Sequence, residues 1–439
     1  MGKSTDDRKG HPVLVHLRRW KELRKVTYRH LEERWGLTDD PVYRRLAGQH
    51  SLNLKEIDGA LELIGLDRNE FLAGVAEGFF PELLLDDVAG RDRDQVRNFR
   101  KSLRKRRPRR VYDAAEVGAA AAGLEALRFR DAHEARELAL DVLRTADLDP
   151  DAAAETWGVL GVLERYAGRV AVAAFCLSEA LRLAASERTR ARTLQRIAML
   201  LLYTTGDADA AMKACRRAAV CYLSCRDLAG MGKTLVDEGV VLLNGQAAYG
   251  EALRAYEKAL ELLPDTEPVY RFGATQGSAV AAVYLGDVAG ALEHLDGALA
   301  ELAAQESSLM YASLLWLKGE IALLLEQYLE AADHFLGVWD CCVDLDLSPL
   351  ETTLVSLRMA KAYFLQGDRR QVRRILHEMV SSLAEVERSH PLLGAALGEF
   401  LREGVRGEVT AEALEEIYRK LREGTETAPP LLPLTLPAS

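Results

Sequence analysis

Apolar residues near the N-terminus recur at helical spacing in short stretches, which glycines and polar residues separate. Leu14, Leu17, Trp20 and Leu23 fall on one face of a first helix. Four similar stretches follow before residue 76. Each is too short to be stable alone, so the helices must bury their apolar faces against one another. Residues 12–76 are therefore predicted to form a five-helix head.

Farther along the chain the apolar pattern becomes longer and repeats. The repeats align on the residue expected to end the first helix of each pair: Arg130, Gly168, Gly206, Ala247, Gly286, Glu326 and Gly367, at intervals of 38, 38, 41, 39, 40 and 41 residues. After the first six of these residues comes a second helix rich in small side chains: Ala135 and Ala139, Ala173 and Ala180, Ala211 and Ala218, Ala252 and Ala259, Ala291 and Ala298, and Ala331. After Gly367 the second helix carries Val372 and Leu376 instead. Small side chains let paired helices approach closely. Residues 113–385 are therefore predicted to form a solenoid of helix pairs.

The remaining segments complete an all-α chain. Residues 386–424 hold two amphipathic stretches, which are predicted to cap the solenoid as a helix pair. Residues 77–112 form a linker that contains an apolar docking segment, Phe79 to Leu85, and a basic block, Arg97 to Arg110. We expect the first eleven residues and the proline-rich residues 425–439 to be disordered.

Charge is divided unevenly along the chain. Residues 1–112 hold 25 Lys and Arg against 18 Asp and Glu, a net charge of +7, whereas the whole chain carries −10 and the remainder therefore −17. A basic head on an acidic body indicates that the head, rather than the body, contacts a polyanion.

Apolar and turn residues of the head follow a specific spacing: Leu17, Trp20, Val26, Thr27, Leu31, Gly36, Leu37, Thr38, Val42, Gly48, Leu54, Ile57, Ala60, Ile64, Gly65, Leu66, Phe71 and Leu72. In these residues the head resembles the helix-turn-helix domain of phage repressors, the XRE family. The resemblance implies contact with double-stranded DNA. The residues expected to make that contact are Thr27, Tyr28, Arg29, Thr38, Tyr43, Arg44, Arg45, Gln49 and His50, with Arg104, Lys105, Arg106 and Arg107 of the basic block along the phosphates.

Two departures from the family pattern keep a second interpretation open. Tyr28 stands where the family has glutamine, and Asp39 and Asp40 begin the recognition helix, where phosphates would repel them. The alternative is a degenerate head that serves in dimerisation or docking, within a non-enzymatic interaction scaffold.

The repeats resemble a tetratricopeptide array across residues 119–383. Two of them show the pattern well, through Trp157, Leu160, Gly161, Gly168, Ala173, Leu177 and Ala180, and through Tyr249, Ala252, Tyr256, Ala259 and Pro264. The resemblance implies a right-handed superhelix whose concave groove is lined by the first helix of each pair. The residues expected to face a peptide or protein segment there are Arg165, Tyr166, Arg196, Tyr203, Asp237, Glu238, Asn244, Gln276, Tyr284, Trp316, Glu320, Arg358 and Lys361.

No set of side chains predicts catalysis, a metal site or a cofactor. Residues 230–234, Gly-Met-Gly-Lys-Thr, imitate a phosphate-binding loop, but the full pattern requires glycine at position 227, which is aspartate. The six cysteines lack metal spacing with histidine and are expected to be buried thiols. No apolar run is long enough for a membrane-spanning helix, and no secretory signal is recognised, so a cytoplasmic location is expected.

These features together resemble bacterial peptide-sensing regulators, in which a helix-turn-helix head is joined to a tetratricopeptide array. The resemblance implies a homodimeric, non-enzymatic transcriptional regulator that binds DNA through the head, with a peptide or protein partner in the groove that modulates the head.

Overall fold

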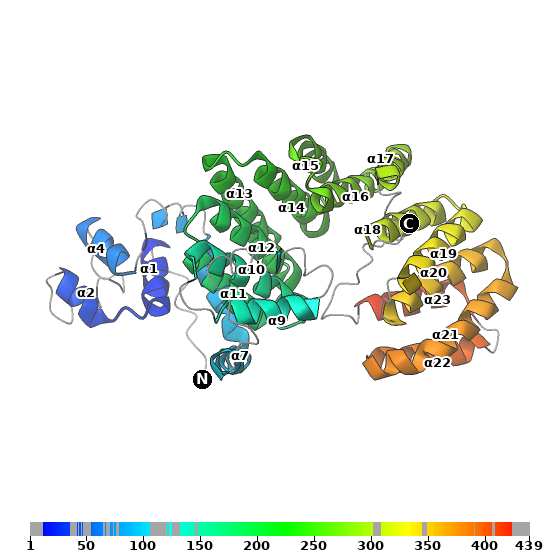
Figure 1. Cartoon of the computed structure of the whole chain (residues 1–439), viewed down its shortest axis with the longest axis horizontal. Coiled ribbons are helices and arrows are strands. Elements are labelled where there is room, and N and C mark those ends of the chain that lie inside the picture. The colour runs from blue at the N-terminus through cyan, green and yellow to red at the C-terminus, as the bar shows by residue number, and fades with distance from the viewer. Residues whose placement is uncertain are drawn as a thin grey trace. The chain divides into compact units, whose positions relative to one another are not determined.

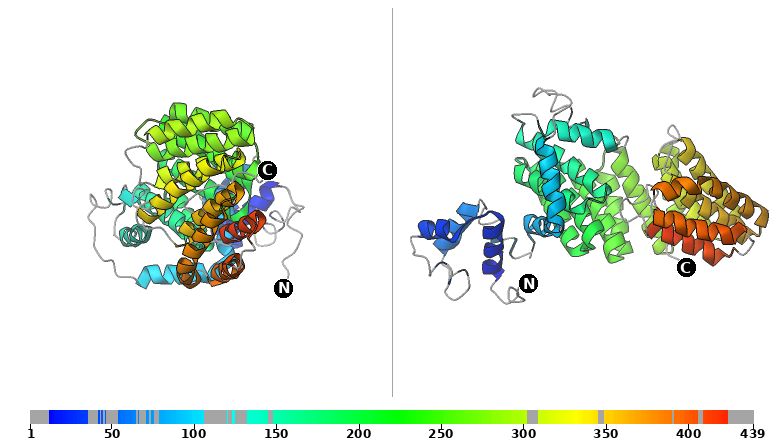
Figure 2. Two further views of the ribbon diagram at one scale, coloured as in Figure 1. Left: turned by 90° about the vertical axis from the view of Figure 1, so that its right-hand side faces the viewer. Right: turned by 90° about the horizontal axis from the view of Figure 1, so that it is seen from below.

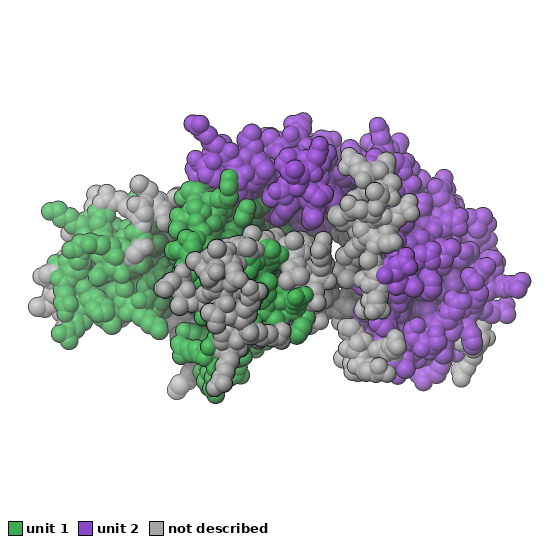
Figure 3. All heavy atoms as spheres, in the orientation of Figure 1, with its two compact units in different colours: residues 1–165, 169–221 green, residues 166–168, 222–439 purple. Residues whose placement is uncertain are grey.

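The computed structural model describes residues 12–35, 42, 44, 46, 54–64, 66, 71–72, 74–75, 79–105, 120, 123–124, 132–144, 148–301, 309–344, 349–389, 391–405 and 409–423. Every regular element in these ranges is helical, as Figure 1 shows, which confirms the all-α prediction. The chain divides into two compact units, residues 1–165 with 169–221, and residues 166–168 with 222–439 (Figure 3). Each unit is described by itself.

The first unit begins with the head and the segment that follows it: α1 (Pro12–Leu23), α2 (Tyr28–Trp35), α4 (Leu54–Ile64), α6 (Pro81–Ala89), the short 3-10 helix η2 (Gly90–Asp92) and α7 (Arg93–Lys105). Its repeat helices are α9 (Ala132–Val142), α10 (Pro150–Tyr166), α11 (Val170–Leu183), α12 (Glu187–Thr205) and most of α13 (Ala208–Ser224). The second unit holds α14 (Leu228–Gln246), α15 (Tyr249–Leu262), α16 (Pro268–Tyr284), α17 (Val288–Glu301), α18 (Leu309–Leu324), α19 (Tyr328–Asp344), α20 (Pro349–Gln366), α21 (Arg369–Ser389), α22 (Pro391–Val405) and α23 (Ala411–Glu423).

The head has its own apolar core. Trp20 and Phe71 are fully buried, and Val42 and Leu46 turn inward from the third predicted helix, as expected from their spacing. Phe80, from the predicted docking segment, completes this core by packing edge-on against Trp20, with 6.0 Å between ring centres. The head is therefore closed by residues that follow its last helix.

The turn within each helix pair has one backbone conformation. Six of the seven residues on which the repeats align lie in the described ranges, and all six have a positive φ: Gly168 70°, Gly206 65°, Ala247 50°, Gly286 82°, Glu326 58° and Gly367 90°. A left-handed residue after the last turn of a helix is a common helix end. The predicted period is confirmed at these six positions; Arg130 lies outside the described residues.

The small residues of the second helices are buried, as predicted. All those named in the sequence pattern are at most 9% exposed, and most are at 0%. Four residues after the first small residue, some second helices carry a larger side chain, which fits against a glycine of the first helix. A Cβ on Gly319 of α18 would lie 2.8 Å from the ring of Phe335 on α19, and one on Gly161 of α10 would lie 2.9 Å from Leu177 on α11.

Two further helices, α22 and α23, follow the repeats in the described residues, where a capping pair was predicted. Figure 2 shows them stacked with the helices of the last repeats. However, α22 packs on α21, whereas α23 packs mainly on α20, the first helix of the preceding pair. Helix α23 therefore lies on the row of first helices.

Candidate functional site

The second helix of the head begins with a reciprocal cap. The hydroxyl of Thr27 accepts a hydrogen bond from the backbone N–H of His30, and the Thr27 N–H donates to Nδ1 of His30, both at 3.2 Å. This arrangement has the form of a capping box in which histidine replaces the usual glutamate. Beside it, Tyr28 is 38% exposed, with Lys21 Nζ 4.1 Å from its ring centre. Arg29 is exposed and pairs with Glu33.

The predicted recognition helix is described only at three alternate positions. Val42 and Leu46 are buried, and Arg44 between them is exposed. This alternation places Arg44 on the outer surface of the head. The predicted contacts Thr38, Tyr43, Arg45, Gln49, His50, Arg106 and Arg107 lie outside the described residues.

Helix α7 carries the described part of the basic block on an ordered surface. One side packs on α11 through Phe99, whose ring is 6.3 Å from that of Phe175, and through Leu103. Arg144 donates a hydrogen bond to the Leu103 carbonyl near the end of the helix. The remaining side exposes all six cations of α7: Arg93, Arg97, Arg100, Lys101, Arg104 and Lys105. Only one acidic residue, Asp94, lies in the same helix, where it pairs with Arg97 at 3.0 Å.

Helix α6 joins the head to the first repeats. Leu83 belongs to the apolar core of the head, and Arg19 of α1 forms an ion pair with Asp87. The same helix packs on α11, and the guanidinium of Arg217 lies 5.1 Å from the ring centre of Phe79 just before it. Helix α6 therefore contacts both the head and α11.

The first helices of the first unit carry cationic and aromatic side chains. Arg165 of α10 lies over the ring of Tyr203 of α12, at 5.2 Å, and Tyr203 is 53% exposed. Arg196 pairs with Glu155 at 3.0 Å, a partner that the sequence did not indicate. Its guanidinium fills the space that a side chain at position 158 would occupy, so Gly158 is what admits it. Tyr166, assigned to the second unit, is 39% exposed.

In the second unit, the predicted groove residues of α14 and α16 have different surroundings. Asn244 is exposed, whereas Asp237, Glu238 and Gln276 are half-buried. Tyr284 stacks on Tyr249 of α15, with 4.2 Å between ring centres and 14° between planes.

The residues that imitate a phosphate-binding loop are used in helix packing. They fall in the first two turns of α14, which Asp227 caps by accepting a hydrogen bond from the Gly230 N–H at 2.9 Å. A side chain at Gly230 would overlap Tyr222, so the glycine is required by packing. Lys233 pairs with Glu267 at 2.6 Å and lies 5.0 Å from the Tyr270 ring centre. This segment is the start of a repeat helix, as the repeat spacing predicts.

The last four predicted groove residues converge on α23. Trp316 of α18 is only 2% exposed, and its ring stacks on Tyr418 of α23, with centres 6.2 Å apart. Arg358 of α20 pairs with Glu320 of α18 at 2.8 Å and with Glu415 of α23 at 2.6 Å. Lys361 also reaches Glu415, at 2.6 Å. The sequence indicated that these side chains face the groove but not that a helix of the same chain covers them.

The ionisation of this cluster follows from burial and from its mixed charges. Burial raises the pKa of Glu320, against the opposing effect of Arg358. Burial alone would lower the pKa of Arg358, but Glu320, Tyr418 and Glu415 outweigh it and raise that pKa. For Glu415, burial acts upward, yet Arg358 and Lys361 lower its pKa overall. The cluster therefore holds a charged arginine between two carboxyl groups.

Metal-ion sites and membrane-spanning helices are both absent from the ranges that the structure describes. No group of three or more His, Cys, Asp or Glu residues there is arranged to hold a metal ion. Nor does any helix in those ranges have the length and apolar character needed to cross a membrane. All cysteines are free thiols, and all but Cys225 are buried.

The chain is similar to known proteins in its fold alone. No family model and no curated protein sequence matches this chain. Among solved structures, a Rap protein complexed with competence and sporulation factor is similar over 72% of this chain and 88% of its own, with 15% identity and a TM-score of 0.51. Aspartyl phosphate phosphatase F from Bacillus subtilis covers 87% of this chain and 95% of its own, at 12% identity and a TM-score of 0.42. PilF of Pseudomonas aeruginosa covers 55% of this chain and 94% of its own, at 18% identity and a TM-score of 0.37. The similarity to the Rap structure concerns the fold alone.

Proposed function

We propose that the protein is a DNA-binding transcriptional regulator, without enzymatic activity, whose solenoid binds a peptide or protein segment that modulates the head. The observation that carries the DNA part is the exposed cationic side of α7, which is held on α11 by Phe99 and Leu103. A helix held in this way presents a fixed array of charges, and cations spaced along a helix suit a phosphate backbone. The helix-turn-helix resemblance of the head supplies the base-reading element.

The proposal for the solenoid is supported by the side chains on the first helices. Exposed tyrosines beside arginines, as at Tyr203 and Arg165, suit the recognition of a polypeptide. The similar Rap structure was solved with a factor bound, which adds a precedent for ligand binding by this fold. The path from α11 through α6 to the head gives such binding a means of acting on DNA affinity. A homodimer is proposed because regulators of this kind read two half-sites with two heads.

Duplex binding as a function of salt tests the proposal. The full chain should bind duplex DNA in dilute buffer and lose affinity steeply toward physiological salt. Arg104→Ala with Lys105→Ala should reduce the slope of log affinity against log salt by about two units, since each phosphate contact contributes about 0.9. Arg44→Ala with Arg45→Ala should weaken or abolish binding to a preferred sequence. As a matched control, Arg182→Ala with Arg188→Ala removes two cations from repeat helices and should leave the slope unchanged.

A non-enzymatic interaction scaffold is the second candidate, with the head used for dimerisation or docking. It is favoured by the two carboxylates of Asp39 and Asp40 at the start of the predicted recognition helix. This candidate requires that the full chain ignores duplex DNA at low salt while still binding a polypeptide.

A further inference from the structure

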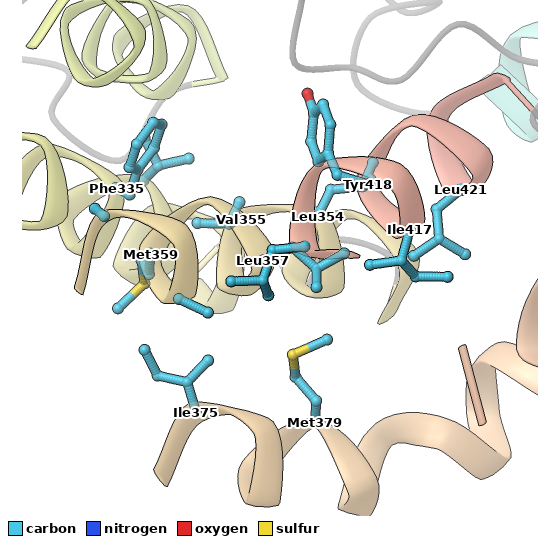
Figure 4. Close-up of a cluster of buried hydrophobic side chains, with 14 of the residues drawn as sticks. Phe335, Leu354, Val355, Leu357, Met359, Ile375, Met379, Ile417, Tyr418 and Leu421 are labelled. Carbon is cyan, nitrogen blue, oxygen red and sulfur yellow. The ribbon is translucent and has the colours of Figure 1, made fainter. Parts of the chain in front are cut away.

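Helix α23 has the pattern of a helical ligand lying in a groove. Leu414, Ile417, Tyr418 and Leu421 follow one another at three- and four-residue steps, and each is at most 4% exposed. Glu416 and Lys420 pair with each other on the opposite, exposed side, at 2.9 Å. Figure 4 shows Ile417, Tyr418 and Leu421 beside Leu354 and Leu357 of α20. One apolar face at this spacing is how an amphipathic helix engages a hydrophobic groove.

The surface beneath α23 differs from the corresponding surface of the earlier repeats. Ten residues before the left-handed turn, successive first helices carry Arg196, Asp237 and Gln276. The next first helix has Trp316 at this position, buried under Tyr418. The position is therefore polar in α12, α14 and α16 and aromatic in α18; in α10 it is Gly158, and in α20 it is the buried Leu357. A large planar side chain at the centre of a contact is a typical binding anchor.

The cations of the groove favour a ligand that carries an acidic residue. Arg358 pairs with Glu320 and Glu415, and Lys361 pairs with Glu415, so without α23 the pair of Arg358 with Glu320 alone would remain of these three. Glu415 of α23 supplies the second carboxylate and contacts both cations at 2.6 Å. An uncompensated buried cation is costly, so the groove selects an occupant with an acidic residue at this place.

We infer that the inner face of α18 and α20 is a binding site for an amphipathic helix that carries an acidic residue followed three positions later by an aromatic one, and that α23 is its intramolecular occupant. The inference rests on the proposed binding of a polypeptide by the solenoid, and it names the class of partner for these two repeats. A partner helix with the same arrangement competes with α23. The groove is accessible to such a partner only when α23 dissociates from α18 and α20.

A synthetic peptide of residues 409–423 with a fluorescent label tests this inference in the full chain. Ile417→Asp with Leu421→Asp detaches α23 without altering α18 or α20. Fluorescence anisotropy should show that the peptide binds this variant at least about tenfold more tightly than it binds the wild-type chain. A Glu415→Gln peptide should bind about tenfold more weakly than the parent peptide. A Glu416→Gln peptide, which loses the same charge from the exposed face, should bind like the parent.

Two results would overturn the inference. One is the absence of peptide binding by a variant whose circular dichroism shows a loss of no more helix than the 13 residues of α23; the other is equal binding of the two glutamine peptides. If the double variant loses more helix than that, Tyr418→Ala in the full chain replaces it and the same comparison applies. Duplex binding is measured on the same samples. If the peptide does not bind but the protein still binds duplex DNA, only this inference is overturned. If the peptide binds but the protein does not bind duplex DNA, only the proposed DNA-binding function is overturned.

Discussion

The guanidinium of Arg358 lies 3.8 Å from the ring centre of Tyr418, so a buried arginine of a repeat helix lies over an aromatic ring of α23. The same guanidinium pairs with carboxylates on either side of it, Glu320 and Glu415. Planar stacking together with charge pairing is a geometry that arginine satisfies and lysine does not. This residue therefore joins three helices, α18, α20 and α23.

Replacing Arg358 with methionine should destabilise the C-terminal repeats. The substitution leaves Glu320, which is 5% exposed, buried without its cation, at a cost of about 3–5 kcal/mol. Glu320→Gln in the same chain should recover part of this loss because it removes the uncompensated charge. Lys420→Met, which breaks an exposed pair on α23, should change stability by less than about 0.5 kcal/mol. Thermal unfolding followed by circular dichroism measures all three, and equal melting temperatures for Arg358→Met and the wild type would contradict the prediction.

The junction between α10 and the α11–α12 turn should weaken in acid. The carboxylate of Asp151 accepts hydrogen bonds from the N–H groups of Ala185 and Ser186, at 2.8 and 3.0 Å. Burial acts to raise its pKa, but these hydrogen bonds outweigh burial and lower the pKa below its ordinary value of 3.8. A carboxyl group with a lowered pKa stabilises the fold above its ordinary value and loses that contribution as pH falls through the lowered value.

The Asp151→Asn variant tests this pH dependence, because the amide keeps an oxygen acceptor but has no charge to titrate. At pH 7 the wild type should have the higher melting temperature. The difference should shrink as pH falls below about 4. A difference that stays constant down to pH 2 would show that the ionised carboxylate is not what stabilises the turn.

Two repeat turns should be improved by glycine. Ala247 and Glu326 have φ values of 50° and 58°, in the left-handed region where a Cβ is unfavourable. Ala247→Gly and Glu326→Gly should each stabilise the protein by about 0.5–1 kcal/mol. The reverse change, Gly206→Ala, should destabilise it through the backbone alone, because a Cβ there would meet no atom within 4 Å. Denaturant unfolding measures the free energy of unfolding of the three variants, which should rise for the two changes to glycine and fall for Gly206→Ala. A change in the same direction for all three would contradict the explanation.

Glycines beneath large side chains should not tolerate even a methyl group. A Cβ on Gly277 of α16 would overlap the ring of Tyr256, which is 1% exposed on α15. Gly277→Ala should therefore cost about 1–3 kcal/mol through overpacking. Gly297→Ala in α17 provides the matched control, since no atom lies near that position. It should stabilise its helix by up to about 1 kcal/mol, as expected from helix propensity. A stabilising Gly277→Ala would show that the ring of Tyr256 moves aside freely.

The repeat architecture could be predicted from the sequence because it depends on the backbone conformation and side-chain size at single positions. A left-handed turn favours glycine, and close helix packing requires small side chains, so Gly206 and Ala211 mark their places directly in the sequence. Helix α23 was expected only as a cap, because a capping helix and a groove-bound helix have the same amphipathic pattern. Which face it covers depends on long-range contacts such as Trp316 with Tyr418. The pair of Lys233 with Glu267, 34 positions apart, was missed for the same reason.

Duplex DNA binding by the full chain is the property that a DNA-binding regulator must have. Anisotropy of a labelled pool of genomic duplexes, titrated with the protein in dilute buffer and again at physiological salt, measures this most directly. We predict saturable binding at low salt, with an affinity that falls by about a hundredfold or more as salt rises, and enrichment of particular fragments in the bound fraction. No binding to any duplex at low salt would contradict the account and leave an interaction scaffold as the function.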